Sequence, residues 1–549
     1  MAKNQFSPLF SQLLRARGLK TQKEITDFLH PDYEKVHDEN LLPDMKKAVE
    51  RIKKAILSGE KMMIFGDYDV DGVTATALLL DALGGLGAKN LSYDLPERMS
   101  DGYGLPTRVV EKIKRERIGL LITVDCGSSN AEIVRELKGL GVDVIITDHH
   151  DVTGELPDAL AVINPKRKDS KYPFQSLSGV GVAFKLVLAL QRQLDGLPCG
   201  QEKWLLDLVA LGTICDQMEL VDENRTYVFY GLKVLGKTRR AGLKALKEIV
   251  GVTEVSSFAV GFLLGPRINA AGRMSSPRLA LELLIVKSRS EAMGLAKEVD
   301  ELNTLRRKLQ DEAMELVEKR QAKRSENVIF IHQPNWHEGV IGIIASKVVE
   351  KYHKPVFVLT GEDELKCSAR SFGDFSVAEA IKNAKKMLIK GGGHAGAGGL
   401  TIKKEHFSAL KKMTWEFHQS LALGNQEKFF DVYSDIETSE LAPLNEAFLK
   451  ELMLLAPFGE GNPEPVVLLR GVLVLDSRSM GAKNQHLRLT VRGKDGVILK
   501  LVAFCAPEAW FVRESETISA WVTLAENKWN GVTSVEARIL RLQIDNEAT

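Results

Sequence analysis

Three short apolar segments, each followed by acidic residues, constrain the fold of this chain more than any other feature. MMIF (62–65), LLITV (120–124) and VDVIIT (142–147) have the length of buried strands, and helical patterns separate them. Such an alternation predicts an α/β domain in which helices cover the faces of a parallel sheet. We place this domain at about residues 46–277.

Acidic residues follow the first of these strands at alternate positions. GDYDVDG places Asp67, Asp69 and Asp71 directly before a helical run. In an extended segment, residues two apart point the same way, and a cation relieves the repulsion of three carboxylates on one face. Two alternatives stay open: a solvated acidic turn that caps the helix, and a phosphate cradle, although three carboxylates repel a bare phosphate. We favour a metal site.

The ends of the next two strands add further candidate ligands. Asp125 ends the second strand, and TDHH adds Asp148, His149 and His150 after the third. Because the carboxyl ends of parallel strands open onto one crevice, these groups are expected to converge with the first three. Oxygen ligands with one or two histidines suit Mn²⁺ or Mg²⁺, and the carboxylates suffice for two ions. A further acid, Asp216, follows LLDLVALGTIC and would be an ordinary loop residue on its own.

The rest of the chain predicts four further parts. Residues 1–45 form a helical lead-in. Residues 278–325 carry apolar residues at spacings of three and four, which predicts one long helix, either connecting two domains or packed within one core. A smaller α/β domain follows at 326–425. Residues 430–549 alternate apolar and polar positions over five segments, which predicts an OB-like β-barrel.

Composition limits the classes of function. The 74 Lys and Arg residues nearly balance the 73 Asp and Glu residues, so nucleic-acid binding would depend on local patches. Five scattered cysteines without CxxC spacing favour a reducing compartment. No segment approaches the apolar length of a membrane span. We therefore expect a soluble cytoplasmic protein without a membrane partner.

Four segments together resemble the metal-binding motifs of the DHH phosphoesterase superfamily: GDYDVDG, VDCG, TDHH and LGTICD. The resemblance implies two bound ions with Asp125 between them, His150 facing the scissile phosphate, and a catalytic role for Asp148. Several members carry a histidine where this chain has Phe65, which leaves open whether Asp67 replaces that ligand. The implied metal ligands are Asp67, Asp69, Asp71, Asp125, His149 and Asp216.

Three other segments narrow the resemblance to the RecJ-type exonucleases. GGGHAGAGG (391–399) is similar to the signature of the DHHA1 domain, and GPRINAAGRM (265–274) and CSARSFG (367–373) are similar to RecJ-type segments. Arginine makes directional, bidentate contacts with phosphate. By this resemblance, the substrate would be bound by Arg267, Asn269, Arg273, Ser368, Arg370, Gly392, Gly393 and His394.

The function that the resemblance implies is that of a single-stranded-DNA-specific 5′ to 3′ exonuclease. It would release 5′-mononucleotides by two-metal-ion hydrolysis in DNA recombination and repair. Its partners would be single-stranded DNA, bound in part by the OB-fold, together with a RecQ-type helicase and a single-strand-binding protein; a monomer is the default expectation. Two alternatives remain. One is a phosphodiesterase for cyclic dinucleotides or short oligonucleotides, whose relatives generally lack the barrel. The other is a non-catalytic replication scaffold, against which the intact ligands argue.

Overall fold

The computed structural model describes residues 6–152, 154–321, 326–421, 432–481, 484–529 and 532–545. The chain divides into two compact units. The barrel unit consists of Met1–Val36, Glu219–Val221 and Phe430–Thr549, and the two-sheet unit consists of His37–Met218 and Asp222–Phe429. Among the described helices, none combines the length and the apolar character needed to cross a membrane.

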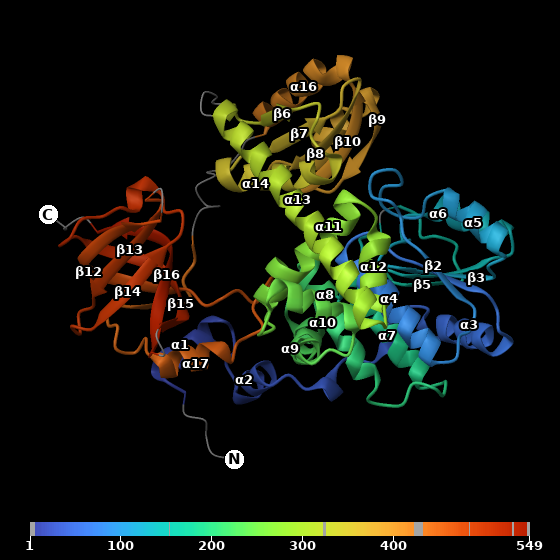
Figure 1. Cartoon of the computed structure of the whole chain (residues 1–549), viewed down its shortest axis with the longest axis horizontal. Helices are drawn as coiled ribbons and strands as arrows, with labels where there is room; N and C mark the ends of the chain where they lie inside the picture. Colours follow the sequence, from blue (N-terminus) through green and yellow to red (C-terminus); the bar gives the residue numbers. More distant parts are fainter. Residues whose placement is uncertain are drawn as a thin grey trace. The chain divides into compact units, whose positions relative to one another are not determined.

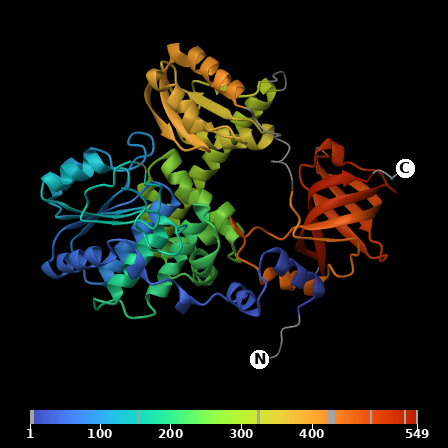
Figure 2. The same cartoon turned by 180° about the vertical axis from the view of Figure 1, so that it is seen from behind.

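A five-stranded parallel sheet lies in the first part of the two-sheet unit (Figures 1 and 2), which confirms the predicted α/β domain. Met63 and Phe65 of β1 pack against apolar residues of α5 and α6, and α7 contacts β3 and β4. The bounds are α3 Met45–Ser58, β1 Met62–Phe65, α4 Val70–Gly85, β2 Leu91–Asp94, α5 Arg108–Glu116, β3 Leu120–Val124, α6 Ala131–Gly139, β4 Asp143–Thr147, β5 Ala161–Ile163 and α7 Gly179–Gln191.

The strand order of this sheet determines where a ligand can bind. The order is β2-β1-β3-β4-β5, so β1 has β2 on one side and β3 on the other. In doubly wound sheets, ligands bind outside the carboxyl ends of the strands at the point where the order reverses. The loops after β1 and β3 border this point, and they carry the first acidic residues that the sequence indicates.

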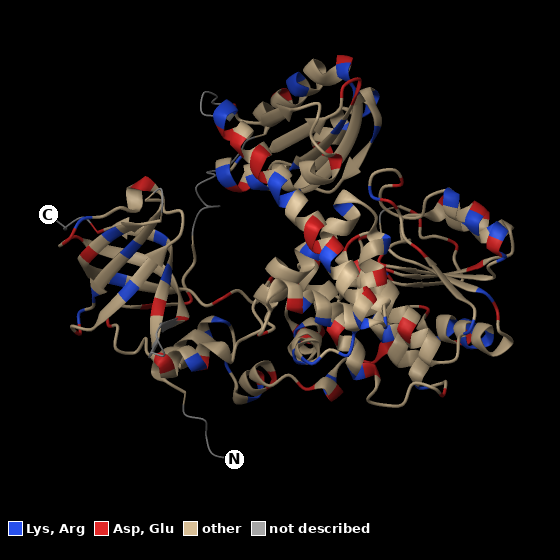
Figure 3. Cartoon of the chain, in the orientation of Figure 1, with Lys and Arg blue, Asp and Glu red and all other residues tan. Residues whose placement is uncertain are grey.

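A group of helices follows the first sheet, and the last of them is long. α13 contacts α10, α11, α12 and α14, and charged residues of both signs recur along it (Figure 3). The bounds are α8 Leu206–Cys215, α9 Asp222–Gly236, α10 Ala241–Val250, α11 Gly265–Met274, α12 Pro277–Ile285 and α13 Arg289–Gln321.

The single helix expected over 278–325 is divided in the structure. Val286, after α12, is extended, with ψ of 139°. Ser288 then accepts a hydrogen bond from the backbone N–H of Glu291, so it caps the start of α13. Residues 322–325 of the expected helix lie outside the described residues.

A second, mixed sheet forms the rest of the two-sheet unit. Its order is β6-β7-β8-β10-β9; β6 and β7 are parallel, and the other pairs are antiparallel. The CSARSFG and glycine-rich segments lie on neighbouring strands, because Ser368 pairs with Gly399 and Arg370 with Ala397. The bounds are β6 Ile329–His332, α14 Glu338–Tyr352, β7 Val356–Thr360, β8 Glu364–Arg370, α15 Val377–Asn383, β9 Leu388–Gly393, β10 Ala397–Lys403 and α16 Phe407–Ser420.

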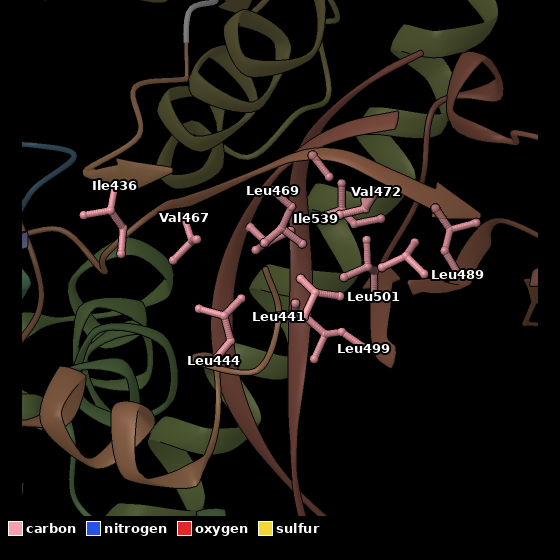
Figure 4. Packing of buried hydrophobic residues seen from close by; sticks show 14 of the residues in the cluster. Ile436, Leu441, Leu444, Val467, Leu469, Val472, Leu489, Leu499, Leu501 and Ile539 are labelled. Atoms are coloured by element: carbon pink, nitrogen blue, oxygen red, sulfur yellow. The ribbon is translucent and has the colours of Figure 1, made fainter. Parts of the chain in front are cut away.

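The barrel unit contains a closed five-stranded barrel, as the alternating pattern predicts. β12 pairs with both β13 and β15, and the ring continues through β14 and β16. Its interior is filled by aliphatic side chains such as Leu469, Leu489 and Leu501 (Figure 4). The bounds are β11 Ile436–Thr438, α17 Glu446–Met453, β12 Val467–Met480, β13 His486–Arg492, β14 Ile498–Ala503, β15 Thr517–Trp529 and β16 Val532–Ile544.

The N-terminal helices α1 (Pro8–Ala16) and α2 (Gln22–Leu29) belong to the barrel unit. Phe10, Leu13 and Leu29 are buried in the same hydrophobic cluster as the barrel interior. The lead-in expected at residues 1–45 is therefore shared between the two units, since the two-sheet unit begins at His37. The apolar face of a short amphipathic helix has to be buried, but the sequence does not show against which domain.

We expect Ser7→Ala to lower the stability of the barrel unit by about 1–2 kcal/mol, because an N-cap and a hydrogen bond across the unit are lost together. The Ser7 hydroxyl accepts from the backbone N–H of Phe10 and donates to the carboxylate of Glu451. Hydrogen exchange should become faster in β12 to β16 and stay unchanged in β1, β3 and β4. Thr21→Ala, which removes the local cap of α2, is the control. Equal protection of the barrel amides in wild type and Ser7→Ala would contradict the prediction.

Candidate metal centre

The loop between β1 and α4 brings three carboxylates to the edge of the parallel sheet. Asp69 is the N-cap of α4, and its Oδ1 accepts from the backbone N–H of Asp71 at 3.0 Å and of Gly72 at 3.2 Å. Asp71 lies in the first turn of the helix. The expectation that Asp67, Asp69 and Asp71 share one face of an extended segment is therefore wrong, because helix capping bends the chain after Asp69.

The predicted acidic and histidine residues nevertheless converge in three groups of potential ligand atoms. In each group, the ligand atoms lie within 4.8 Å of one another. Asp125 and His149 each belong to two groups, so the groups form one continuous cluster. The groups are Asp67, Asp69 and Asp125; Asp71, His149 and Asp216; and Asp125, His149 and His150.

His149 lies at the centre of this cluster. Its Nε2 is 3.1 Å from Asp125 Oδ1, 3.6 Å from Asp216 Oδ2 and 3.8 Å from Asp71 Oδ2. Burial, and next the charge of His150, lower the pKa of His149 to about 3. The imidazole is therefore neutral at pH 7, which is the form that binds metal ions.

Within the residues that the structure describes, several buried polar atoms of the cluster have no hydrogen-bond partner. They include Asp67 Oδ1, Asp125 Oδ1 and His149 Nε2. Orphaned buried polar atoms are rare in folded proteins, and an ion is one of the partners that can satisfy them. Carboxylate oxygens with an imidazole nitrogen are ligands that suit Mn²⁺ and Mg²⁺. The residues present thus fit a divalent metal ion.

The carboxylates of the cluster repel one another. Burial, and next the charge of Asp69, raise the pKa of Asp71 to about 7. Burial, and next Asp71, raise the pKa of Asp216 to about 9, and the pKa of Asp125 is raised for the same two reasons. Cations lower this electrostatic cost by neutralising the carboxylates.

The N-terminus of α7 contacts the cluster, an interaction that sequence reasoning missed. The backbone N–H groups of Gly179 and Val180 donate to the two oxygens of Asp71, at 2.6 Å and 2.9 Å. A Cβ at Gly179 would lie 2.5 Å from Asp125 Oδ1, so a side chain cannot fit there without a shift. The signal was present in SGVGVAF, where the N-cap Ser178 and glycines precede an apolar helix.

Asp148 holds His150, a member of the cluster, by a hydrogen bond. Its Oδ1 lies 2.9 Å from His150 Nδ1, and its Oδ2 accepts from the backbone N–H of Ser128 at 2.9 Å. Burial alone would raise the pKa of Asp148, but the hydrogen bond and charge of His150 outweigh it and lower the pKa. Tyr103 also contacts His150, with 2.9 Å between Oη and Nδ1. Sequence reasoning missed Tyr103, because its loop carries no recognisable pattern.

A group of arginines adjoins the acidic cluster through Tyr68. The guanidinium of Arg98 lies 4.6 Å from the centre of the Tyr68 ring. Burial, and next the charges of Arg98 and Arg306, lower the pKa of Arg273 to about 9. Burial, and next Arg98, also lower the pKa of Arg370. These cations are therefore close enough to repel one another.

Two of these arginines, Arg273 and Arg370, make no hydrogen bond or ion pair with a carboxylate in the described part of the chain. Within the described residues, Arg273 donates to the carbonyl of Gly339 at 3.5 Å, and Arg370 donates to the Ser346 and Ser368 hydroxyls and the carbonyl of Ala369. All these acceptors are neutral, so Arg273 and Arg370 remain available for an anion. Sequence reasoning missed Arg98 and Arg306 as members of this group.

The other predicted substrate-binding residues differ in their surroundings. Arg267 forms an ion pair with Asp300, at 2.7 Å, and Asn269 is partly exposed two residues along α11. Gly392, Gly393 and His394 are exposed at the turn between β9 and β10. In the described part of the chain, no hydrogen bond or ion pair joins this turn to the acidic cluster. The roles of these five residues stay predictions.

Family models match three parts of the chain. They are the DHH family, N-terminal domain, at residues 61–213, the DHHA1 domain at 325–420 and the RecJ OB domain at 435–541. The first match covers the parallel sheet and every member of the acidic cluster except Asp216, the second covers the mixed sheet, and the third covers the barrel up to residue 541.

Relatives and solved structures agree with these matches. The single-stranded-DNA-specific exonuclease RecJ of Bacillus subtilis is 37% identical over 95% of this chain and 66% of its own length. The protein of that name from Haemophilus influenzae is 35% identical over 90% of this chain and 89% of its own length. The crystal structure of RecJ in complex with Mn²⁺ from Thermus thermophilus matches 98% of this chain and 76% of that chain, with a TM-score of 0.84 and 31% identity. Since all three domains and nearly the whole length are matched, the chain belongs to the RecJ family of DHH proteins.

Proposed function

We propose that this protein is a single-stranded-DNA-specific exonuclease that releases 5′-mononucleotides from the 5′ end with the help of two Mn²⁺ or Mg²⁺ ions. One observation carries the proposal: a cluster of buried ligand atoms adjoins a group of partly buried arginines, of which Arg273 and Arg370 have no carboxylate partner among the described residues. Metal ions and a phosphate-rich substrate are the two kinds of ligand that such neighbours require. The family of the chain specifies the substrate as single-stranded DNA.

Six residues would hold the ions. Asp125 belongs to two of the donor groups, so it is suited to lie between two ions. Several family members have a metal-binding histidine where this chain has Phe65. Asp67 would replace that ligand, and its buried Oδ1, which has no hydrogen-bond partner among the described residues, supports this role. When bound, the ions activate water and neutralise charge on the phosphate. The ligand set is Asp67, Asp69, Asp71, Asp125, His149 and Asp216.

His150 would contact the scissile phosphate. Burial alone would lower the pKa of His150. The hydrogen bond with Asp148 and the charge of that carboxylate outweigh the effect of burial, so the pKa of His150 is raised. A protonated imidazole offsets negative charge on the phosphate oxygens, and Asp148 fixes the orientation of the ring through Nδ1. Asp148 thus acts through His150.

The arginine group would bind the 5′ phosphate. Arg273, Arg370 and Ser368 present guanidinium and hydroxyl groups beside one another, and Arg98 adds a further cation. A terminal phosphate held here lies at a fixed distance from the metal cluster, which would give cleavage of one nucleotide at a time from the 5′ end. Arg267, Asn269, Gly392, Gly393 and His394 are proposed to contact the adjacent backbone.

The barrel would bind the strand farther from its 5′ end. A row of residues on adjacent strands includes Arg478, Arg488 and Arg538, because Arg478 pairs with Arg488, and Val502 pairs with both Arg488 and Arg538. Phe504 is 60% exposed, and its ring centre is 5.7 Å from the guanidinium of Arg538. Cations next to an exposed aromatic ring are typical of single-strand binding by OB-folds.

The proposal extends to the cellular setting. We propose a monomer that acts in the cytoplasm in DNA recombination and repair, with a RecQ-type helicase and a single-strand-binding protein as partners. The functional parts would be the DHH domain at 46–277, the connecting segment at 278–325, the DHHA1 domain at 326–425 and the OB domain at 430–549. The residues up to Val36 would act together with the OB domain.

A panel of substrates tests the function. The panel contains a single-stranded oligonucleotide labelled at its 5′ end, the same strand labelled at its 3′ end, a blunt duplex, a cyclic dinucleotide and pApA. We expect the 5′-labelled single strand to release labelled mononucleotide first, in Mn²⁺ or Mg²⁺ and not in chelator. Hydrolysis of only the cyclic dinucleotide or pApA would favour a small-substrate phosphodiesterase, and metal-independent binding without cleavage would favour a scaffold.

We expect Gly179→Ala to slow hydrolysis of single-stranded DNA about tenfold, as changes beside metal ligands commonly do. The new Cβ would press on Asp125 Oδ1 and displace either Asp125 or the start of α7. Gly84→Ala in α4 is the matched control, because nothing lies within 4 Å of a Cβ there. The measurement is the initial rate of nucleotide release at saturating Mn²⁺. Equal rates in Gly179→Ala and the control would contradict the prediction that a side chain at residue 179 displaces Asp125.

A further inference from the structure

Phe258 and Phe262 form an exposed aromatic pair on the two-sheet unit. Their side chains are 61% and 69% exposed. The two rings stack, with 4.9 Å between their centroids and 25° between their planes. Two large apolar rings held together in water provide a flat platform, and neither ring has a role in the hydrolytic site described above.

The helix that carries this pair has an unusual geometry. Ala259–Leu264 (η4) is a π-helix that continues directly into α11. Such turns are rare and are frequently found at functional sites. Phe258 and Phe262 are four residues apart and lie on one side of it. Gly261 and Gly265, also four apart, face α8, because a Cβ on them would lie 3.7 Å from Ile214 and 2.3 Å from Cys215.

This packing connects the pair to both halves of the hydrolytic site. Ile214 and Cys215 directly precede Asp216, a member of the acidic cluster. The helix that begins at η4 continues through α11 and carries Arg273 of the arginine group. The exposed rings are therefore on the same packed elements as a proposed metal ligand and a proposed phosphate-binding residue.

We propose that Phe258 and Phe262 are a base-stacking platform for an unpaired nucleobase of the strand that the enzyme degrades. The inference rests on the proposed function and adds a specificity-determining contact to it. Every base has a π-face, so stacking on these rings would be independent of sequence. It would also require an unpaired base and would thus favour single-stranded over duplex DNA.

The surroundings of the pair favour a base over a protein partner. The side chains exposed just before it in the chain are polar, namely Thr253, Glu254 and Ser256. Within residues 251–265, the two rings are the only large apolar side chains that are exposed, and Val252, Val255 and Leu263 are partly buried. Stable protein interfaces use about 20–30 residues a side. Two stacked rings offer one flat face to a base, and the helix that carries them continues into α11, which carries Arg273.

Two double variants with opposite expectations test the platform. Alanine at Phe258 and Phe262 removes the rings, whereas tyrosine keeps them. With a 5′-phosphorylated oligothymidylate, we expect the alanine variant to raise KM about 5- to 100-fold, since stacking of a base on an aromatic ring contributes this much to affinity. The tyrosine variant should keep the wild-type KM. Leu57→Ala, which removes a 73% exposed side chain of α3, is the control for loss of surface apolar area.

A single abasic site, moved one position at a time along the oligonucleotide, identifies the stacked base. In the wild type, we expect one position at which the missing base raises KM, and in the alanine variant no such position. Two results would overturn the platform. One is a wild-type KM in the alanine variant. The other is a wild-type KM in a variant with leucine at both positions, because leucine has no π-face on which a base can stack. In either case the wild type would still degrade the strand, so the proposed function would stand. A wild type that fails to degrade single-stranded DNA would refute the proposed function itself.

Discussion

Asp125→Asn is expected to lower the rate of nucleotide release from single-stranded DNA by about 1000-fold or more. Asp125 belongs to two of the three donor groups, so its loss would remove a ligand from both of the proposed ion positions at once. Bound metal ions contribute several kcal/mol to stabilisation of the transition state, and each 1.36 kcal/mol is a factor of ten in rate. Single-turnover release of the 5′ nucleotide at saturating Mn²⁺ measures this effect.

The stability of the same variant separates a lost ligand from a lost fold. Without metal, Asp125 is a buried carboxylate among like charges, so asparagine should leave the melting temperature in chelator equal or higher. Mn²⁺ should raise the melting temperature of the wild type and not that of the variant, because binding stabilises only a fold with an intact site. Asp143→Asn, at the opposite edge of the sheet in an ion pair with Arg51, is the matched control and should retain activity. If Asp125→Asn melted well below the wild type in chelator, its loss of nucleotide release would be due to misfolding and not to a missing metal ligand.

Arg273→Met is expected to make the protein more stable and less active. Arg273 is partly buried, and it lies near Arg98, Arg306 and Arg370, which repel it. Replacing buried charges by apolar side chains of similar size often stabilises a protein by about 1–4 kcal/mol. The value of kcat/KM for a 5′-phosphorylated single strand should fall about 100-fold, since a hydrogen bond to a charged group contributes up to about 3 kcal/mol.

Two comparisons make the Arg273 prediction specific. Arg240→Met removes a buried arginine that is paired with Asp81 and Asp207, so it should lower stability by about 3–5 kcal/mol, the opposite sign. A strand with a 5′ hydroxyl group should show a smaller activity difference between wild type and Arg273→Met than the 5′-phosphorylated strand. A destabilised Arg273→Met protein, or equal losses on both strands, would argue against a phosphate site at Arg273.

The sequence predicted the parallel sheet and its cluster of acids because both depend on local patterns. Short apolar strands alternate with helices, and Asp125 and the Asp148–His149 pair follow such strands directly. Parallel strands end at one edge, so convergence of these side chains follows from the topology alone. The convergence of Asp216 rested on the resemblance, because no strand precedes it.

Contacts between distant segments were beyond the reach of sequence patterns. Gly179 supports Asp71, which is 108 residues away in the chain. Arg98 and Tyr103 belong to a loop without a motif, and they are recognised as part of the site only by their contacts with Tyr68 and His150. The packing of α1 against the barrel likewise joins residues more than 400 positions apart. Periodicity shows that a face is buried but not what covers it.

The central claim is that the acidic cluster holds the metal ions that hydrolyse single-stranded DNA from its 5′ end. The most direct measurement titrates Mn²⁺ into metal-free protein while the release of labelled nucleotide from a 5′-labelled single strand is followed in the same sample. We predict no release in chelator and a rate that rises in step with the Mn²⁺ bound. Release in chelator, or Mn²⁺ bound by Asp125→Asn as tightly as by wild type, would contradict the claim.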